Sequence, residues 1–214
     1  MTSELLDLSE LQLDRVRELT NIGAGHAANA FATLVGRQFR MRVPTIRFLR
    51  AEAAGSTLAA TTRDDEERGM AGIFFEVEGG LGGVLALLFP EESRVRILET
   101  LTGQSADAVD EEMAESALRE LGNILISHVV NAMADTLGAR ILPSVPVLAM
   151  KDGFSELAAL VAHRVDSAAV LRVETEISDP EGRFRGVLVF VPDRAALVPP
   201  PKRGPVRIVS SRPG

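Results

Sequence analysis

The chain has 214 residues, of which 46% are hydrophobic and 25% charged, and its formal net charge is −7. This composition is typical of one compact globular domain or of two tightly joined halves, and it excludes wholesale disorder. The absence of cysteine excludes disulfides, thiolate metal sites and cysteine nucleophiles. The acidic balance and the lack of Trp and Tyr argue against a nucleic-acid-binding protein.

The first predicted element is a long helix. Apolar residues recur at mostly helical spacing from Glu10 to Gly36, and a glycine there is a typical C-terminal stop. Extended chain follows at Val43-Pro44, because the residue before a proline avoids helical angles. We then expect strands at 56–61, 72–78 and 83–89 and an amphipathic helix from Glu91 to Gly103.

The second half of the chain has a similar order of predicted elements. It begins with a helix from Glu111 to Gly138, for which Asp110 is the expected N-cap. Strands are predicted at 157–164, 169–177 and 185–191, and a last helix near Asp193 is expected to be replaced by prolines. Helices that alternate with antiparallel strands indicate an α+β fold.

The two halves are copies of one unit. When the sequence is shifted by 102 residues, twelve of the 31 positions from Asp14 to Pro44 are identical. The sequence thus predicts a single domain over 1–193 that consists of two repeats, at about 10–103 and 111–193. We expect these repeats to pack as a pseudo-twofold pair, with their long helices on a mostly antiparallel sheet.

The C-terminal segment differs from the rest. Residues 194–214 carry five basic and no acidic residues and five of the chain's 11 prolines, so that residues 1–193 carry −12. We expect a Pro-rich, basic, disordered tail, and the alternative is a docking peptide. The N-terminus has no basic n-region, and no apolar stretch is long enough to span a bilayer, so the sequence predicts a cytoplasmic protein.

The most informative residues recur on the two long helices. Glu18 and Asn21 match Glu120 and Asn123, and a Glu and an Asn three residues apart lie on one helix face. Asn is unfavourable inside a helix because its side chain competes with the backbone for hydrogen bonds. Its presence twice at one place therefore suggests a function, and the alternative is that each Asn caps a neighbouring loop.

These residues also carry a family resemblance. Asp14-x3-Glu18-x2-Asn21-x22-Pro44 recurs with the same spacing in the second half, where Ser116 replaces the aspartate. The pattern resembles the two motif helices of the CheC–CheX–FliY family of bacterial chemotaxis phosphatases.

That resemblance implies hydrolysis of the aspartyl phosphate of a CheY-type response regulator. It implies that Asn21 and Asn123 position a water and that Glu18 and Glu120 reach the regulator's active-site lysine. An amide suits this role, because its carbonyl accepts from water and its NH2 donates to phosphoryl oxygen. We expect no cofactor of the chain's own, because the Mg²⁺ would belong to the regulator. A CheD-like deamidase is a second implied partner.

Other patterns are assigned no function. Gly23-Ala24-Gly25 lacks the preceding strand and the further residues of a nucleotide-binding loop. His26 and His128 occupy matched places in opposite repeats, so a metal pair is not expected. Two alternatives to catalysis stay open: a flagellar-switch scaffold, and a protein that sequesters the phosphorylated regulator without hydrolysing it.

Overall fold

The structure is a computed structural model, and it describes residues 9–50, 69–164 and 169–193. Within these residues the chain is an α+β domain, which confirms the predicted fold class. The helices are α1 (Glu10–Val35), α3 (Glu91–Thr102), the short 3-10 helix η4 (Ala106–Ala108), α4 (Glu111–Leu137) and α5 (Gly153–Arg164). The strands are β1 (Arg40–Met41), β2 (Thr45–Arg50), β3 (Ala71–Gly79), β4 (Gly83–Phe89), β5 (Ile141–Pro143), β6 (Val147–Ala149), β7 (Ala169–Ser178) and β8 (Arg185–Pro192).

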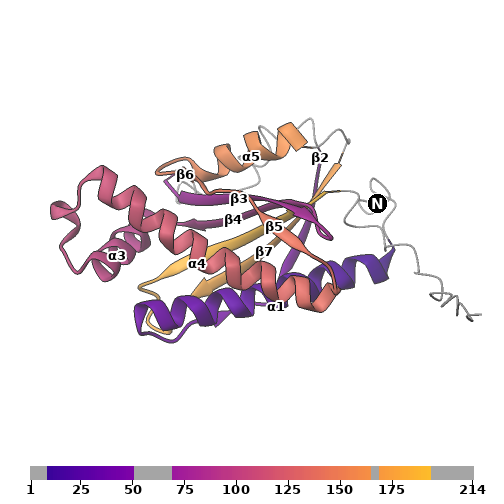
Figure 1. The fold of residues 1–214 in the computed structure, drawn as a ribbon, viewed down its shortest axis with the longest axis horizontal. Helices are drawn as coiled ribbons and strands as arrows, with labels where there is room; N and C mark the ends of the chain where they lie inside the picture. Colours follow the sequence, from indigo (N-terminus) through magenta and orange to yellow (C-terminus); the bar gives the residue numbers. More distant parts are fainter. Residues whose placement is uncertain (1–8, 51–68, 165–168, 194–214) are drawn as a thin grey trace, which may run out of the picture.

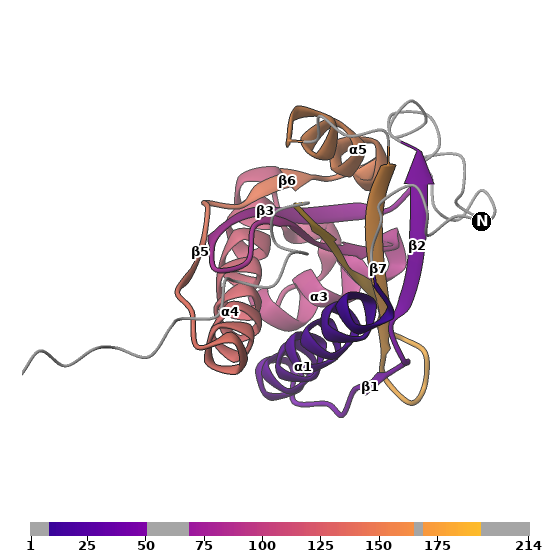
Figure 2. The ribbon, with the colours of Figure 1, turned by 90° about the vertical axis from the view of Figure 1, so that its right-hand side faces the viewer.

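All strands belong to one antiparallel sheet, in which the two halves of the chain interlock. The strand order is β1-β7-β8-β4-β3-β5, with β2 also paired to β7 and β6 to β3. The short strands of the first half therefore lie on β7 of the second half, and those of the second half lie on β3 of the first. Figure 2 shows that the sheet is strongly curved, so that β3 and β7 run in clearly different directions.

The two long helices lie side by side on one face of the curved sheet, and α5 covers part of the other face (Figures 1 and 2). α1 packs on β7, α4 packs on β3 and β5, and α5 packs on β3 and β4. Figure 1 shows that α1 and α4 run in opposite directions, because α1 begins at the end of the pair where α4 leads into β5. One large apolar cluster fills the space between this helix pair and the sheet.

Local sequence signals define both long helices. Ser9 forms a capping box with Gln12 at the start of α1, and Asp110 accepts a hydrogen bond from the Met113 N–H at 2.8 Å at the start of α4. Each helix ends at a glycine in the left-handed region, Gly36 at φ 66° and Gly138 at φ 60°. The predicted N-cap and both glycine stops are confirmed.

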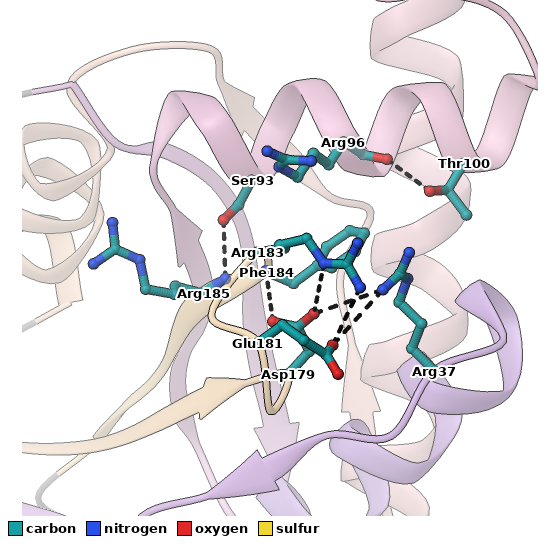
Figure 3. A network of polar contacts seen from close by, with 9 residues as sticks. All are labelled: Arg37, Ser93, Arg96, Thr100, Asp179, Glu181, Arg183, Phe184 and Arg185. Carbon is teal, nitrogen blue, oxygen red and sulfur yellow. Dashed lines mark hydrogen bonds and ion pairs between the residues drawn. The ribbon is translucent and has the colours of Figure 1, made fainter.

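The β7–β8 hairpin holds the end of α1 and the start of α3 in place (Figure 3). Asp179 is buried, accepts a hydrogen bond from the Phe184 N–H at 2.9 Å, and lies 3.9 Å from the guanidinium of Arg37 just after α1. The N–H of Arg185 donates to Ser93 of α3 at 2.9 Å. The hairpin thereby fixes the helix that carries the first Glu/Asn pair.

One predicted strand is wrong. Residues 157–164 belong to helix α5, whose Phe154, Leu157, Ala158 and Val161 are all buried. Their spacing of three, one and three residues is that of a helix face packed on a sheet. This helical periodicity is the signal that the strand prediction missed.

Three expectations concern residues outside the described ranges: the strand at 56–61, the replaced helix after Asp193 and the tail 194–214. Among the described residues, no helix is long and apolar enough to cross a bilayer.

Candidate functional site

Both Glu/Asn pairs lie on the exposed surface of the long helices. Glu18 and Asn21 are exposed on α1, and Glu120 and Asn123 are exposed on α4. Within the described part of the chain, none of these four side chains forms a hydrogen bond or an ion pair. The structure therefore gives no support to the alternative in which each Asn caps a neighbouring loop. Four polar side chains are left available to a partner.

The residue one turn before each Glu/Asn pair, on the same helix face, differs between the two helices. Asp14, one turn before Glu18, pairs with Arg17 at 2.6 Å, and both side chains are largely exposed. Its counterpart on α4 is the neutral Ser116, which is also exposed. The two sites thus share the Glu and Asn groups but differ by one charged group at their margin.

An edge segment of the sheet lies next to each motif helix. Arg119, the neighbour of Glu120, donates to the Pro146 carbonyl at 3.1 Å, which fixes the loop between β5 and β6 against α4. In the first half, Met41 of β1 lies beside α1, since its Cε would be 3.8 Å from a Cβ at Gly25. Each motif therefore has a strand edge as its neighbour on the helix flank.

These edge segments carry residues that the sequence did not single out as functional. Val43 is 79% exposed and Val145 is 82% exposed, whereas the prolines that follow them are buried. Exposed large apolar residues at matched places next to a polar site are typical of contact surfaces. The signal available in the sequence was the repeated Val-Pro dipeptide.

A shallow groove between α1 and α4 contains both motif-helix histidines. The groove has a volume of about 460 Å³, and its lining includes His26 and Asn29 from α1 and His128 from α4. The two histidines belong to opposite repeats in the sequence, and the structure places both in the lining of one groove. No group of three or more metal-ligating side chains occurs among the described residues.

Glycines next to the motif residues allow close packing of both long helices. A Cβ on Gly23 would lie 2.7 Å from Met133 Cε and 3.0 Å from Val129 Cγ1 of α4. A Cβ on Gly122, beside Asn123, would lie 2.6 Å from Ile73 Cγ2 of the sheet. Each motif helix therefore presents its polar side chains outward while its small residues seat it on its neighbours.

Known proteins resemble this chain in sequence. The model of the CheC-like family matches residues 11–47 and 113–150, two segments that begin 102 residues apart and contain both Glu/Asn pairs. "CheY-P phosphatase CheC" of Bacillus subtilis is 31% identical over 169 residues, which are 74% of this chain and 78% of that protein. "Putative CheY-P phosphatase CheC1" of Halobacterium salinarum is 27% identical over 201 residues, 92% of this chain and 96% of that protein.

Solved structures share the fold at low sequence identity. FliY of Thermotoga maritima superposes with a TM-score of 0.66 at 22% identity, over 89% of this chain and 93% of that one. The CheX-CheY-BeF3-Mg complex of Borrelia burgdorferi contains a chain that matches with a TM-score of 0.54 at 12% identity, over 80% and 96%. The FliM middle domain of H. pylori matches with a TM-score of 0.61 at 12% identity, over 89% and 98%. From its B. subtilis relative and the doubly matched family model, the chain belongs to the CheC-like family.

Proposed function

We propose that this chain hydrolyses the aspartyl phosphate of a CheY-type response regulator, with one site at Glu18 and Asn21 and a second at Glu120 and Asn123. The observation that carries the proposal is the exposure of these four unpartnered side chains on convex helix surfaces. A small substrate is normally enclosed by a pocket. Polar groups that project from a helix suit a protein substrate that brings its own cleft.

The comparisons support the same reaction. The two curated relatives are named as CheY-P phosphatases, and the matched family segments contain all four residues. A CheX chain with this fold was solved together with CheY, beryllofluoride and Mg²⁺. These findings concern the relatives, and they make a phosphorylated regulator the first substrate to test.

The proposed chemistry requires little from this chain beyond positioning. An aspartyl phosphate is already reactive, so the catalyst must place a water in line with the phosphorus and stabilise charge. Asn21 and Asn123 are the proposed water-positioning residues, because an amide both accepts and donates hydrogen bonds. Glu18 and Glu120 are proposed to bind the regulator's active-site lysine through a charge-assisted hydrogen bond.

The proposal needs no metal held by this chain. The regulator is proposed to supply the Mg²⁺, and the reaction would take place in the cytoplasm, where such regulators act. A CheD-like deamidase is a second proposed partner, which rests on the family resemblance alone.

The decisive experiment follows the decay of a phosphorylated CheY-type regulator with and without this protein. We expect faster decay with the wild type and a loss of about 100-fold or more in the Asn21→Ala/Asn123→Ala variant, the magnitude seen when one preorganised polar group is removed from an active site. A matched control is Asn29→Ala/Asn131→Ala, which removes the next exposed asparagine from each of the same two helices. Wild-type activity in the first double variant would contradict the assignment.

The glutamates act in docking, and salt separates that role from catalysis. Removing one partner of a desolvated charge pair costs about 2–5 kcal/mol, whereas a pair at an interface rim costs much less. Glu18→Ala and Glu120→Ala should therefore weaken affinity, and added salt should weaken wild-type binding more than binding of the double Glu variant. Equal salt sensitivity of the two proteins would mean that the glutamates do not form the pair.

The competing function is a binding module that does not hydrolyse the phosphate. The similarity in fold to the FliM middle domain favours it. A scaffold or a sequestering protein would bind the phosphorylated regulator and leave its decay unchanged or slower, which the same assay detects.

A further inference from the structure

The two Glu/Asn sites face away from each other, and this arrangement determines how many partners can bind. α1 and α4 run antiparallel in contact (Figure 1), and Gly23 of α1 packs between Val129 and Met133 of α4. Gly23 therefore marks the side of α1 that faces α4, and Val129 marks the side of α4 that faces α1.

Helix geometry then gives the direction of each polar pair. Successive residues turn by about 100°, so Asn21 lies about 160° and Glu18 about 140° around α1 from Gly23. On α4, Glu120 lies about 180° and Asn123 about 120° around the helix from Val129. Both pairs thus point away from the neighbouring helix, toward opposite flanks of the helix pair.

The distance between the sites is short compared with a protein partner. Gly23 is level with residue 131, which places Asn21 about 15 Å from Asn123 along the antiparallel axes. Across the pair, one interaxial spacing and two helix radii add about 14 Å, so the two Cα atoms are roughly 20 Å apart. A compact domain of roughly 100 residues has a radius of gyration of about 13 Å and hence a diameter of about 34 Å.

These lengths decide whether two partners fit, and the answer depends on whether the sites share one face of the helix pair or lie on opposite flanks. On one common face, two partners with centres about 20 Å apart would overlap. On opposite flanks, each centre lies a further radius of about 17 Å outward, so the centres are separated by about 48 Å across the pair. We propose that one chain binds two response regulators at the same time, one on each flank of the α1–α4 pair.

The strand edges next to the helices support the placement of the two partners on opposite flanks. Val145 is held next to α4 through the contact of Arg119 with Pro146, on the sheet edge formed by β5 and β6. Val43 lies between β1 and β2, which form the opposite end of the sheet. Each exposed valine therefore extends its site outward along its own edge, not inward across the groove that the helices share.

The inference rests on the proposed function, because the partner is the regulator that Glu18 and Glu120 are proposed to bind. The test uses a single-domain CheY-type regulator activated with beryllofluoride and Mg²⁺. Isothermal titration and the mass of the complex by light scattering give the number bound per chain. Glu18→Lys and Glu120→Lys block one site each, and Glu92→Lys on α3 is a control with the same change of charge at an exposed position.

We expect two regulators per chain for the wild type and the Glu92→Lys control, one for each single-site variant and none for the double variant. At saturating phosphorylated regulator, the wild-type turnover should equal the sum of the turnovers of the two single-site variants, each about half of the wild type.

Two results would overturn the inference. A wild type that saturates at one regulator while both single-site variants also bind one shows mutually exclusive sites, although the proposed function survives. A count of two that persists in the double variant places docking elsewhere. If the wild type neither binds the regulator nor accelerates its dephosphorylation, the proposed function itself is wrong.

Discussion

Replacement of Gly122 by alanine tests the contact that seats α4 on the sheet. A Cβ at this position would lie 2.6 Å from Ile73 Cγ2 and 3.1 Å from Phe75 Cζ, whereas ordinary contacts begin near 3.4 Å. The structure must therefore open by about 0.8 Å at Ile73. Ile73 is fully buried and β-branched, so its Cγ2 cannot move without a change of rotamer or of backbone position.

The expected loss of stability follows from two opposing terms. Overpacking of a well-packed core typically costs about 1–3 kcal/mol. Alanine gains about 1 kcal/mol over glycine in a helix, which offsets part of this cost. We expect Gly122→Ala to lower the free energy of unfolding by about 1 kcal/mol, which corresponds to a decrease of about 2–4 °C in Tm for a domain of this size.

Gly25→Ala provides the matched control, because among the described residues its Cβ would meet only Met41 Cε, at an ordinary 3.8 Å. The helix gain is then unopposed, and Tm should rise by about 2–4 °C. Thermal unfolding followed by circular dichroism distinguishes the two signs. If Gly122→Ala raises Tm as Gly25→Ala does, the close contact between α4 and β3 does not exist in solution.

Two further predictions concern ion pairs. Arg94 donates to Glu91 at 2.6 Å, and this hydrogen bond lowers the pKa of Glu91 below its ordinary value of 4.5. The pair therefore stabilises the fold above pH 4.5, and this stabilisation is lost as the pH falls through the folded-state pKa. Because Glu91 is half exposed, Glu91→Gln should cost only about 0.3–0.5 kcal/mol at pH 7 in urea unfolding. This cost should decrease as the pH falls below 4.5, and an equal cost at pH 7 and at pH 3 would contradict this explanation. Arg164 binds Asp193 at 2.8 Å and also Glu76, so Arg164→Ala leaves two neighbouring carboxylates unpaired. We expect the variant to lose about 2 kcal/mol of unfolding free energy in urea unfolding, and this loss should decrease with added salt. A loss that is independent of salt would mean that it comes from packing.

The parts of the fold that could be predicted are those with local signals. Asp110 and Gly36 define helix ends through the backbone groups that they satisfy or the angles that they adopt, so their roles can be read without knowledge of the neighbours. The error at 157–164 came from a local signal that the prediction did not use. Phe154, Leu157 and Val161 recur at helical spacing, and they are buried on one face of α5.

The candidate site could be predicted only in part. The repeated Glu18 and Asn21 pattern is a feature of sequence spacing, and its placement on one helix face follows from helix geometry. The contribution of Val43 depends on the pairing of β1 and β2 with β7, more than 100 residues away, and no local pattern encodes that pairing. The shared position of His26 and His128 likewise depends on the antiparallel register of α1 and α4.

The interlocked sheet has a consequence for synthesis on the ribosome. Thr45 of β2 pairs with Glu174 of β7, and Val77 of β3 pairs with Pro143 of β5, so strands of the first half pair with residues that are synthesised much later. The nascent first half therefore leaves the ribosome with an unpaired edge at β3 and with β2 lacking its partner, a state prone to misassociation. Two such halves on separate chains could pair with each other in the same way, so co-expressed fragments divided between α3 and α4 should reassemble.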